Sequence, residues 1–234
     1  MCTVSWIYQD DGYQLLCNRD ERRTRAKALP PKILTQNGVR FIAPIDGDFG
    51  GTWIATNEFG VSICLLNGHP RESARPRLSR GMVVLKLIAA ASVRRVQELL
   101  GSLDLSTFAS FTLAALQTGQ PATVVEWSGA ELAARDPGVC LLTSSSYDWE
   151  AVQLARRLEF EGRVRSRNVR ALSEFHESHA AEGGAYSVCM HRDDAETVSF
   201  SRVEVTRTET SFFYTPDAPC RRVPGERHSL AIAA

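Results

Sequence analysis

Two short stretches near the start of the chain carry the residue types from which a catalytic site could be built. Cys2 is the second residue, and the strand-like run "YQLLCNRDERR" ends in a dense cluster of amide, guanidinium and carboxylate groups at positions 18–21. Cysteine is small enough for the initiator Met1 to be trimmed ahead of it. Trimming would leave a thiol and a free α-amine on Cys2, and an α-amine of pKa about 8 can act as a base near neutral pH.

Whether these two stretches meet depends on the register of the hairpin that joins them. The runs "CTVSWIY" and "YQLLCNR" flank the turn signal "QDDG". A turn built on all of "QDDG" places Cys2 opposite Arg19. A three-residue "DDG" turn places it opposite Asp20, and a two-residue "DG" turn places it opposite Glu21. Directly paired Cβ atoms are about 5 Å apart, so each register puts the charged cluster beside Cys2.

These residue types together predict nucleophilic chemistry. Arg19 would stabilise the Cys2 thiolate and lower its pKa, and a carboxylate, either Asp20 or Glu21, would hold the amine in place. The chemistry also needs a donor for the negative charge that develops on a carbonyl oxygen. We expect the neutral side-chain amide of Asn67, at the end of "VSICLLNG", to be that donor.

His69 is the histidine that we expect nearest to this pocket. It would act either in proton transfer or, as the preferred interpretation, as the cap of a loop. The glycines Gly50, Gly51 and Gly68 would let the backbone come close to a ligand.

A second group of residues could bind a metal. His176 and His179 are spaced i, i+3 on a predicted helix, and Cys189 and His191 fall on one face of the predicted strand "AYSVCMH". Ordinary core packing accounts for Cys189, however, and the six cysteines are scattered without a CxxC pair. We therefore predict neither a metal nor a cofactor.

The elements that must position these residues follow an order of strands, helices, strands, helices and strands. Helical spacing appears in residues 82–103, in "YDWEAVQLARRLEFEG" and in "VRALSEFHES", and Ser92 is a good N-cap. Hairpin connections outnumber βαβ units, which predicts an α+β domain of antiparallel sheet with helices packed on it. We expect one domain over residues 1–217 and a loosely held tail over residues 218–234.

Composition narrows the possible partners. The 234 residues include 27 Lys+Arg and 27 Asp+Glu, so the net charge is zero, and 44% of the residues are hydrophobic. A neutral chain has no general electrostatic attraction for nucleic acid or an anionic membrane. No apolar run is long enough for membrane insertion, and the N-terminus lacks the pattern of a signal peptide. These features predict a cytoplasmic protein that binds a small molecule.

The motifs resemble, in order and spacing, those of the NRDE family, also called the transport and Golgi organisation protein 2 family. The matching stretches are Met1-Cys2, "NRDE" at 18–21, "GGTW" at 50–53 and "TNEFGVSICLLN" ending at Asn67. That family is in turn similar to N-terminal nucleophile hydrolases of the choloylglycine hydrolase and penicillin V acylase group. The resemblance implies a four-layer αββα sandwich, with Cys2 as nucleophile, its own amine as base and Asn67 as oxyanion donor.

The chain departs from the acylase group, whose second strand ends in Arg-Asn-x-Asp. Because residues 18 and 20 share one strand face and residues 19 and 21 the other, the departure leaves open whether Asn18 or Arg19 faces Cys2. It also leaves open whether Asp20 or Glu21 is the acid.

Two further positions follow from the same resemblance. Ser144, in "LLTSSS", stands where a second active-site asparagine of the acylases is expected. Arg202, in "SFSRVEV", or Arg192, in "CMHR", would correspond to a late arginine of that group.

Two functions remain open at this point. The first is an amidohydrolase that cleaves a non-peptide C–N bond through a thioester on Cys2. The alternative is a non-catalytic binding or trafficking protein on the same fold, whose pocket handles a lipid, an acyl group or haem.

Overall fold

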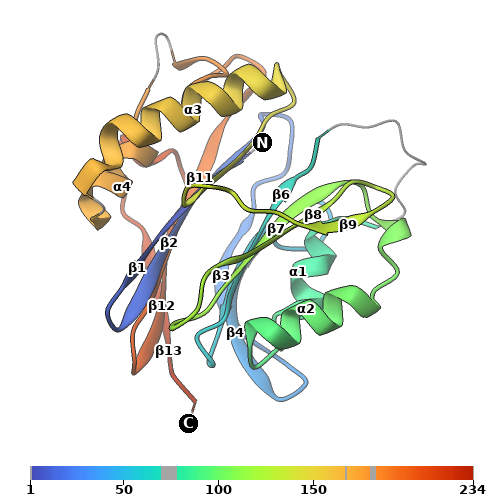
Figure 1. Ribbon diagram of the computed structural model, residues 1–234. Helices are drawn as coiled ribbons and strands as arrows, with labels where there is room; N and C mark the ends of the chain where they lie inside the picture. Colours follow the sequence, from blue (N-terminus) through green and yellow to red (C-terminus); the bar gives the residue numbers. More distant parts are fainter. Residues whose placement is uncertain (1, 70–77, 167, 180–182, 234) are drawn as a thin grey trace.

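A computed structural model describes residues 2–69, 78–166, 168–179 and 183–233 of the chain. It contains two antiparallel sheets (Figure 1). The six-stranded sheet has the order β10-β1-β2-β11-β12-β13. Its strands are β1 (Cys2–Gln9), β2 (Gly12–Arg22), β10 (Leu141–Ser144), β11 (Ala195–Val205), β12 (Glu209–Thr215) and β13 (Glu226–Ala231).

The seven-stranded sheet has the order β3-β4-β5-β6-β7-β8-β9, so its strands pair in sequence order. They are β3 (Leu29–Gln36), β4 (Val39–Ile45), β5 (Ile54–Asn57), β6 (Ser62–Asn67), β7 (Phe111–Leu116), β8 (Thr123–Trp127) and β9 (Leu132–Ala134). β5 and β6 form a second hairpin, with the turn at residues 58–61.

Helices cover the outer face of each sheet (Figure 1). They are α1 (Gly81–Leu87) and α2 (Val93–Ser102) on the seven-stranded sheet, and α3 (Trp149–Arg163) and α4 (Val169–His176) on the six-stranded sheet. One apolar core lies between the sheets, and one lies under each helical layer. The predicted α+β fold, a four-layer αββα sandwich, is confirmed.

The first hairpin has the register of the "QDDG" turn. Tyr8 pairs with Tyr13 and Cys2 pairs with Arg19. Alternate residues of β2 then point to opposite cores. Cys17 belongs to the core between the sheets, and Leu16 belongs to the core under α3 and α4.

Three sequence expectations need correction. The segment 82–103 is two helices separated by residues 88–92, and Ser92 caps the second by accepting from the backbone N–H of Arg95 (3.1 Å). Residues 185–191 form no strand and are tied to β11 by a single bridge at His191. The tail from residue 218 is not loose, because the apolar side chain of Leu230 is buried and β13 pairs along β12.

Within the described ranges, the structure has no helix that is both long and apolar enough to cross a membrane.

Candidate active site

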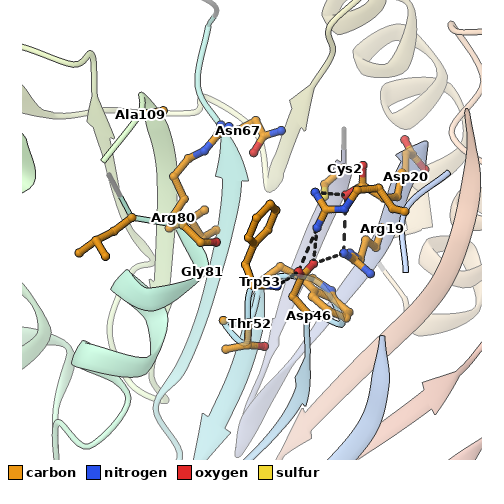
Figure 2. Close-up of a pocket in the computed structure, with 17 residues that line it drawn as sticks. Cys2, Arg19, Asp20, Asp46, Thr52, Trp53, Asn67, Arg80, Gly81 and Ala109 are labelled. Atoms are coloured by element: carbon orange, nitrogen blue, oxygen red, sulfur yellow. Dashed lines mark hydrogen bonds and ion pairs between the residues drawn. The ribbon is translucent and has the colours of Figure 1, made fainter. Parts of the chain in front are cut away.

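A pocket of about 380 Å³ opens where the ends of β1, β2 and β6 meet the loop 46–53 and the start of α1 (Figure 2). Cys2, Arg19, Asp20, Glu21 and Asn67 all line it. Its volume lies within the range of small-molecule sites, although at the lower end. The structure therefore brings the residues that the first hairpin was expected to gather into one cavity, together with Asn67 from the second sheet.

Cys2 is the first residue of β1 and is half-buried. Its backbone N–H donates to the Oγ of Ser144 (3.0 Å), which lies opposite it on β10. A hydrogen bond with the Cys17 thiol and burial raise the pKa of the Cys2 thiol well above its usual value. The thiol is thus neutral at rest, and it needs a base to become a nucleophile. Met1 lies outside the described residues.

Arg19 faces the pocket from β2, but its positive charge is already paired with acidic side chains. Its Nη2 donates to Oδ2 of Asp46 (2.5 Å), and its guanidinium lies 4.2 Å from the centre of the Trp53 ring. Glu21, on the same strand face, is 3.6 Å away. Arg25 also donates to both oxygens of Asp46, at 2.9 and 2.8 Å. Arg19 is therefore part of a fixed ion-pair network at the pocket edge.

Asp20 is buried and is bonded toward the outer helical layer. Its Oδ1 accepts from the hydroxyl of Thr197 (2.6 Å), and its Oδ2 accepts from Arg156 of α3 (3.4 Å). Arg156 is itself fully buried, and it also donates to the Thr3 hydroxyl (2.7 Å) and the Ala185 carbonyl (3.2 Å). This buried ion pair holds Asp20 next to the end of β1.

Asn18 faces away from Cys2. Its amide donates to the carbonyls of His176 (2.9 Å) and Val188 (3.0 Å), and its Oδ1 accepts from Nδ1 of His176 (2.9 Å). The departure from the acylase pattern left open whether Asn18 or Arg19 faces Cys2. In the structure Arg19, and not Asn18, lies beside Cys2. Glu21 shares the pocket face with Arg19, and Asp20 is held by Arg156 behind the strand.

The side of the pocket opposite Cys2 and Arg19 is formed by Asn67 and Arg80 (Figure 2). Asn67 is exposed at the end of β6. The "GGTW" motif positions Arg80, because a Cβ on Gly51 would lie 2.7 Å from the Gly81 carbonyl carbon. Gly51 thus makes room for the main chain at the start of α1. Gly51 also lines the pocket, so its main chain lies beside the space where a ligand would bind.

Arg80 is a pocket residue that sequence reasoning missed. Its guanidinium donates to the Ser110 carbonyl (3.2 Å), and burial lowers its pKa. It forms no ion pair with any residue in the described ranges. An arginine stays charged under such conditions, so Arg80 adds a positive charge to the pocket, and the charge of Glu21 acts on it without a direct ion pair.

The other missed residues are Asp46 and Arg156. Asp46 follows β4 in an unremarkable "DGD" turn, and nothing local links it to Arg19. Arg156 did leave a signal, since it falls in the buried stripe of α3 with Val152 and Phe160 at spacings of four residues. A charged residue in such a stripe predicts a buried partner.

Two expected residues lie elsewhere. The ring of His69 packs edge-on against Trp149, 5.2 Å between centres, and it does not line the pocket. Arg202 stacks on Phe213 at 4.1 Å and pairs across the sheet with Leu16, on the face opposite Cys17. The other alignment is Arg192, which pairs with Asp194 and also does not line the pocket.

The chain has the fold of three enzymes of known structure. The C2A mutant of conjugated bile acid hydrolase from Clostridium perfringens has 12% sequence identity and a TM-score of 0.60, with 99% of this chain and 92% of that chain covered. Penicillin V acylase from Agrobacterium tumefaciens has 12% identity and a TM-score of 0.55, with 100% and 92% covered. The Caenorhabditis elegans ortholog of N-acylethanolamine-hydrolyzing acid amidase has 10% identity and a TM-score of 0.57, with 86% and 91% covered.

The chain belongs to the family described as Transport and Golgi organisation 2, whose model matches residues 1–212. Comparison with curated protein sequences finds no match. The identities to the solved structures are low, so those structures establish the shared fold and no more than that.

Proposed function

We propose that the chain is an amidohydrolase that cleaves a non-peptide amide bond through a thioester on Cys2. The observation that carries the proposal is the position of Cys2. It begins a strand on the wall of the pocket, and its main-chain nitrogen is held by Ser144 at 3.0 Å. Removal of Met1 would turn that nitrogen into an amine on the residue that carries the thiol.

The raised pKa of Cys2 supports a particular order of events. Since the thiol is neutral, the free α-amine takes its proton as the sulfur attacks the substrate carbonyl carbon. The carbonyl oxygen becomes an oxyanion, and the Nδ2–H of Asn67 is the proposed donor to it. Collapse breaks the C–N bond, and the ammonium proton goes to the leaving amine. Water then attacks the thioester and restores the thiol.

The remaining groups have supporting roles in this scheme. Ser144 holds the main-chain nitrogen of Cys2, and Arg156 holds Asp20, which would orient the free amine. Arg19 shapes the pocket edge with Asp46 and Trp53 instead of stabilising a free thiolate. Arg80 would bind an anionic group of the substrate, for example a carboxylate next to the scissile amide, because a guanidinium recognises carboxylates with paired N–H donors.

The rival function is a non-catalytic carrier on the same fold. The neutral Cys2 thiol and the paired charge of Arg19 favour it. In that case the pocket would hold an anionic lipid, an acyl group or haem against Arg80, and the thiol would not turn over.

The test begins with intact mass, which must show a chain that starts at Cys2. That chain is incubated with N-acyl amino acids and N-acylethanolamines, the released amine is measured, and acid-quenched samples are searched by mass for an acyl group on Cys2. We expect Cys2→Ser to lose at least about 1,000-fold in turnover, as removal of a nucleophile does. A chain with one extra residue before Cys2 should lose as much, because the amine is then an amide.

The matched control is Cys140→Ser, which alters another half-buried cysteine outside the pocket and should keep the parent turnover. The carrier function predicts a different result. A chain that begins at Cys2 would then release no amine from any amide, and Cys2→Ser and the extended chain would bind a fluorescent fatty acid as well as the parent does.

A further inference from the structure

Four side chains outside the pocket converge in a second cluster. They are His179, Cys189, His191 and Cys220, and one ligand atom from each lies within 4.8 Å of the others. The Nε2 of His191 is 3.6 Å from the Sγ of Cys189 and 3.2 Å from the Sγ of Cys220. Around a tetrahedral Zn²⁺, with bonds of about 2.3 Å to sulfur and 2.0–2.1 Å to nitrogen, neighbouring ligand atoms lie roughly 3.3–3.8 Å apart. The two distances from His191 are close to that spacing, and every other pair of ligand atoms lies within 4.8 Å.

The ligand set differs from the one considered in the sequence. His176 is not a member, because its ring nitrogens contact Ser5 (2.8 Å) and Asn18 (2.9 Å) in the core under α4. Cys220 takes its place, from the 3₁₀ turn η4 (Pro219–Arg221) near the end of the chain. No spacing pattern could reveal it, since 29 residues separate it from His191.

The histidine tautomer fits metal binding. The Nδ1 of His179 is 3.0 Å from the carbonyl oxygen of Cys189. A carbonyl can only accept, so Nδ1 carries the hydrogen and Nε2 keeps its lone pair. A hydrogen bond of this kind, from the ring nitrogen that does not bind the metal to a carbonyl, orients most histidine ligands of metals.

Main-chain hydrogen bonds hold two of the four residues in place independently of any metal. The N–H of Cys189 donates to the Ser178 carbonyl (2.9 Å), and the N–H of His191 donates to the Gly183 carbonyl (2.7 Å). These bonds fix the segment that carries Cys189 and His191 against the residues that follow α4. The fold therefore preorganises this half of the donor set.

We propose that His179, Cys189, His191 and Cys220 form a structural site for a divalent transition metal of the zinc type. Two thiolates and two neutral imidazoles balance the charge of the ion and fill its four positions, which leaves none for a substrate. The site joins the end of α4, the segment 183–192 and η4. It also lies behind the pocket, because Met190 and Thr197 exchange hydrogen bonds (2.9 and 2.8 Å) and Thr197 donates to Asp20.

The test uses the full chain in a Cys2→Ser background, because the thiol and amine of a processed Cys2 can themselves chelate a metal. The reduced protein is freed of metal with a chelator and titrated with Co²⁺ alone. We expect one Co²⁺ per chain, intense visible bands of tetrahedral cobalt and sulfur-to-cobalt charge transfer in the near ultraviolet. Added Zn²⁺ should displace the cobalt and remove both signals. None of these readouts depends on hydrolysis.

Variants locate the site. Cys220→Ser and His191→Ala should each weaken Co²⁺ binding by more than about 100-fold, which exceeds the loss from changing a residue that only orients a ligand. Cys220→His keeps a ligand, so it should bind Co²⁺ with reduced charge transfer even if Cys220→Ser folds poorly. The matched controls Cys140→Ser and His228→Ala, outside the cluster, should bind as the background chain does.

Three results would overturn the site. The first is a reduced chain that binds less than one Co²⁺. The second is a folded Cys220→Ser chain with the affinity and spectrum of the background. The third is a disulfide between Cys189 and Cys220 that survives reductant.

Discussion

The two faces of β2 at the NRDE segment are built in different ways. On the pocket face, Arg19 and Glu21 belong to a network with Asp46 and Arg25, in which each acid has more than one cationic neighbour. On the helix face, the buried side chains of Asn18 and Asp20 are bonded to specific partners from α3, α4 and β11. Arg19 and Glu21 thus belong to an ion-pair network, and Asn18 and Asp20 are anchored to the helical layer, although Asp20 also lines the pocket.

This difference between the two faces predicts which substitutions should lower stability and which should lower activity. Arg156 and Asp20 have side chains that are 0% exposed, so neither water nor a flexible neighbour can replace a lost partner. Glu21 is 23% exposed and Arg25 is 28% exposed, and both can be solvated after a change. The helix face should therefore respond in stability, and the pocket face in activity.

The largest effect on stability is expected from Arg156→Met. It leaves the buried carboxylate of Asp20 without the guanidinium beside it, and breaking a buried pair from one side costs about 3–5 kcal/mol. Arg19→Met on the pocket face should cost only about 1–2 kcal/mol, because Asp46 keeps Arg25 and the backbone N–H groups of residues 48 and 49. Urea unfolding of the two variants measures the difference. Equal losses would erase the distinction between the faces.

The next effect tests the pocket side. Asn67→Ala should lower kcat by about 100–1,000-fold, the usual result of removing one oxyanion donor. The unfolding free energy should stay unchanged, because Asn67 is exposed at the end of β6. Asn67→Asp keeps the shape but lacks the N–H donor, so it should be as slow as Asn67→Ala. Unchanged kcat in both variants would remove Asn67 from the reaction.

Much of the fold was predictable because its signals are local. The hairpin β1–β2, the Ser92 cap and the hairpin β5–β6 follow from turn residues and from alternation over short distances. Cys2, Arg19 and Asp20 could be brought together for the same reason, since a single turn sets their register.

What was missed depends on contacts between distant segments. Asp46 and Arg80 reach the pocket because the loop 46–53 packs on the start of α1. No periodic pattern in the sequence indicates this contact. Cys220 meets His191 only because β13 and η4 return to the first sheet. Arg202 was placed by resemblance and His69 by its nearness to Asn67 in the sequence, and tertiary packing directs both to other partners.

The pocket face should also determine which substrates bind. Arg80→Met should raise KM about 10–100-fold for an amide that carries a carboxylate, because a hydrogen bond to a charged group contributes about 1.5–3 kcal/mol. For a neutral amide of the same acyl chain, KM should not change. Arg80→Lys should recover part of the loss, and Arg94→Met, on the exposed surface of α2, is the control. Equal losses with charged and neutral amides would mean that Arg80 only supports the fold.

The smallest effect is a dependence of stability on pH that belongs to the helix face. Burial, with the charge of Arg156 as a second cause, lowers the pKa of His176 to about 3. The unfolded chain takes up this proton near pH 6.5 and the folded chain does not, so this contribution to stability is present above pH 6.5 and is lost as the pH falls toward 3.

The loss from His176 should be about 1 kcal/mol over the first pH unit below 6.5. His176→Gln removes the titrating group, so its unfolding free energy should fall less steeply with acid than that of the parent, whatever its stability at pH 7. Parallel slopes for the parent and His176→Gln would show that the imidazole is not held neutral between Asn18 and Ser5. The helix face would then be as adaptable as the pocket face.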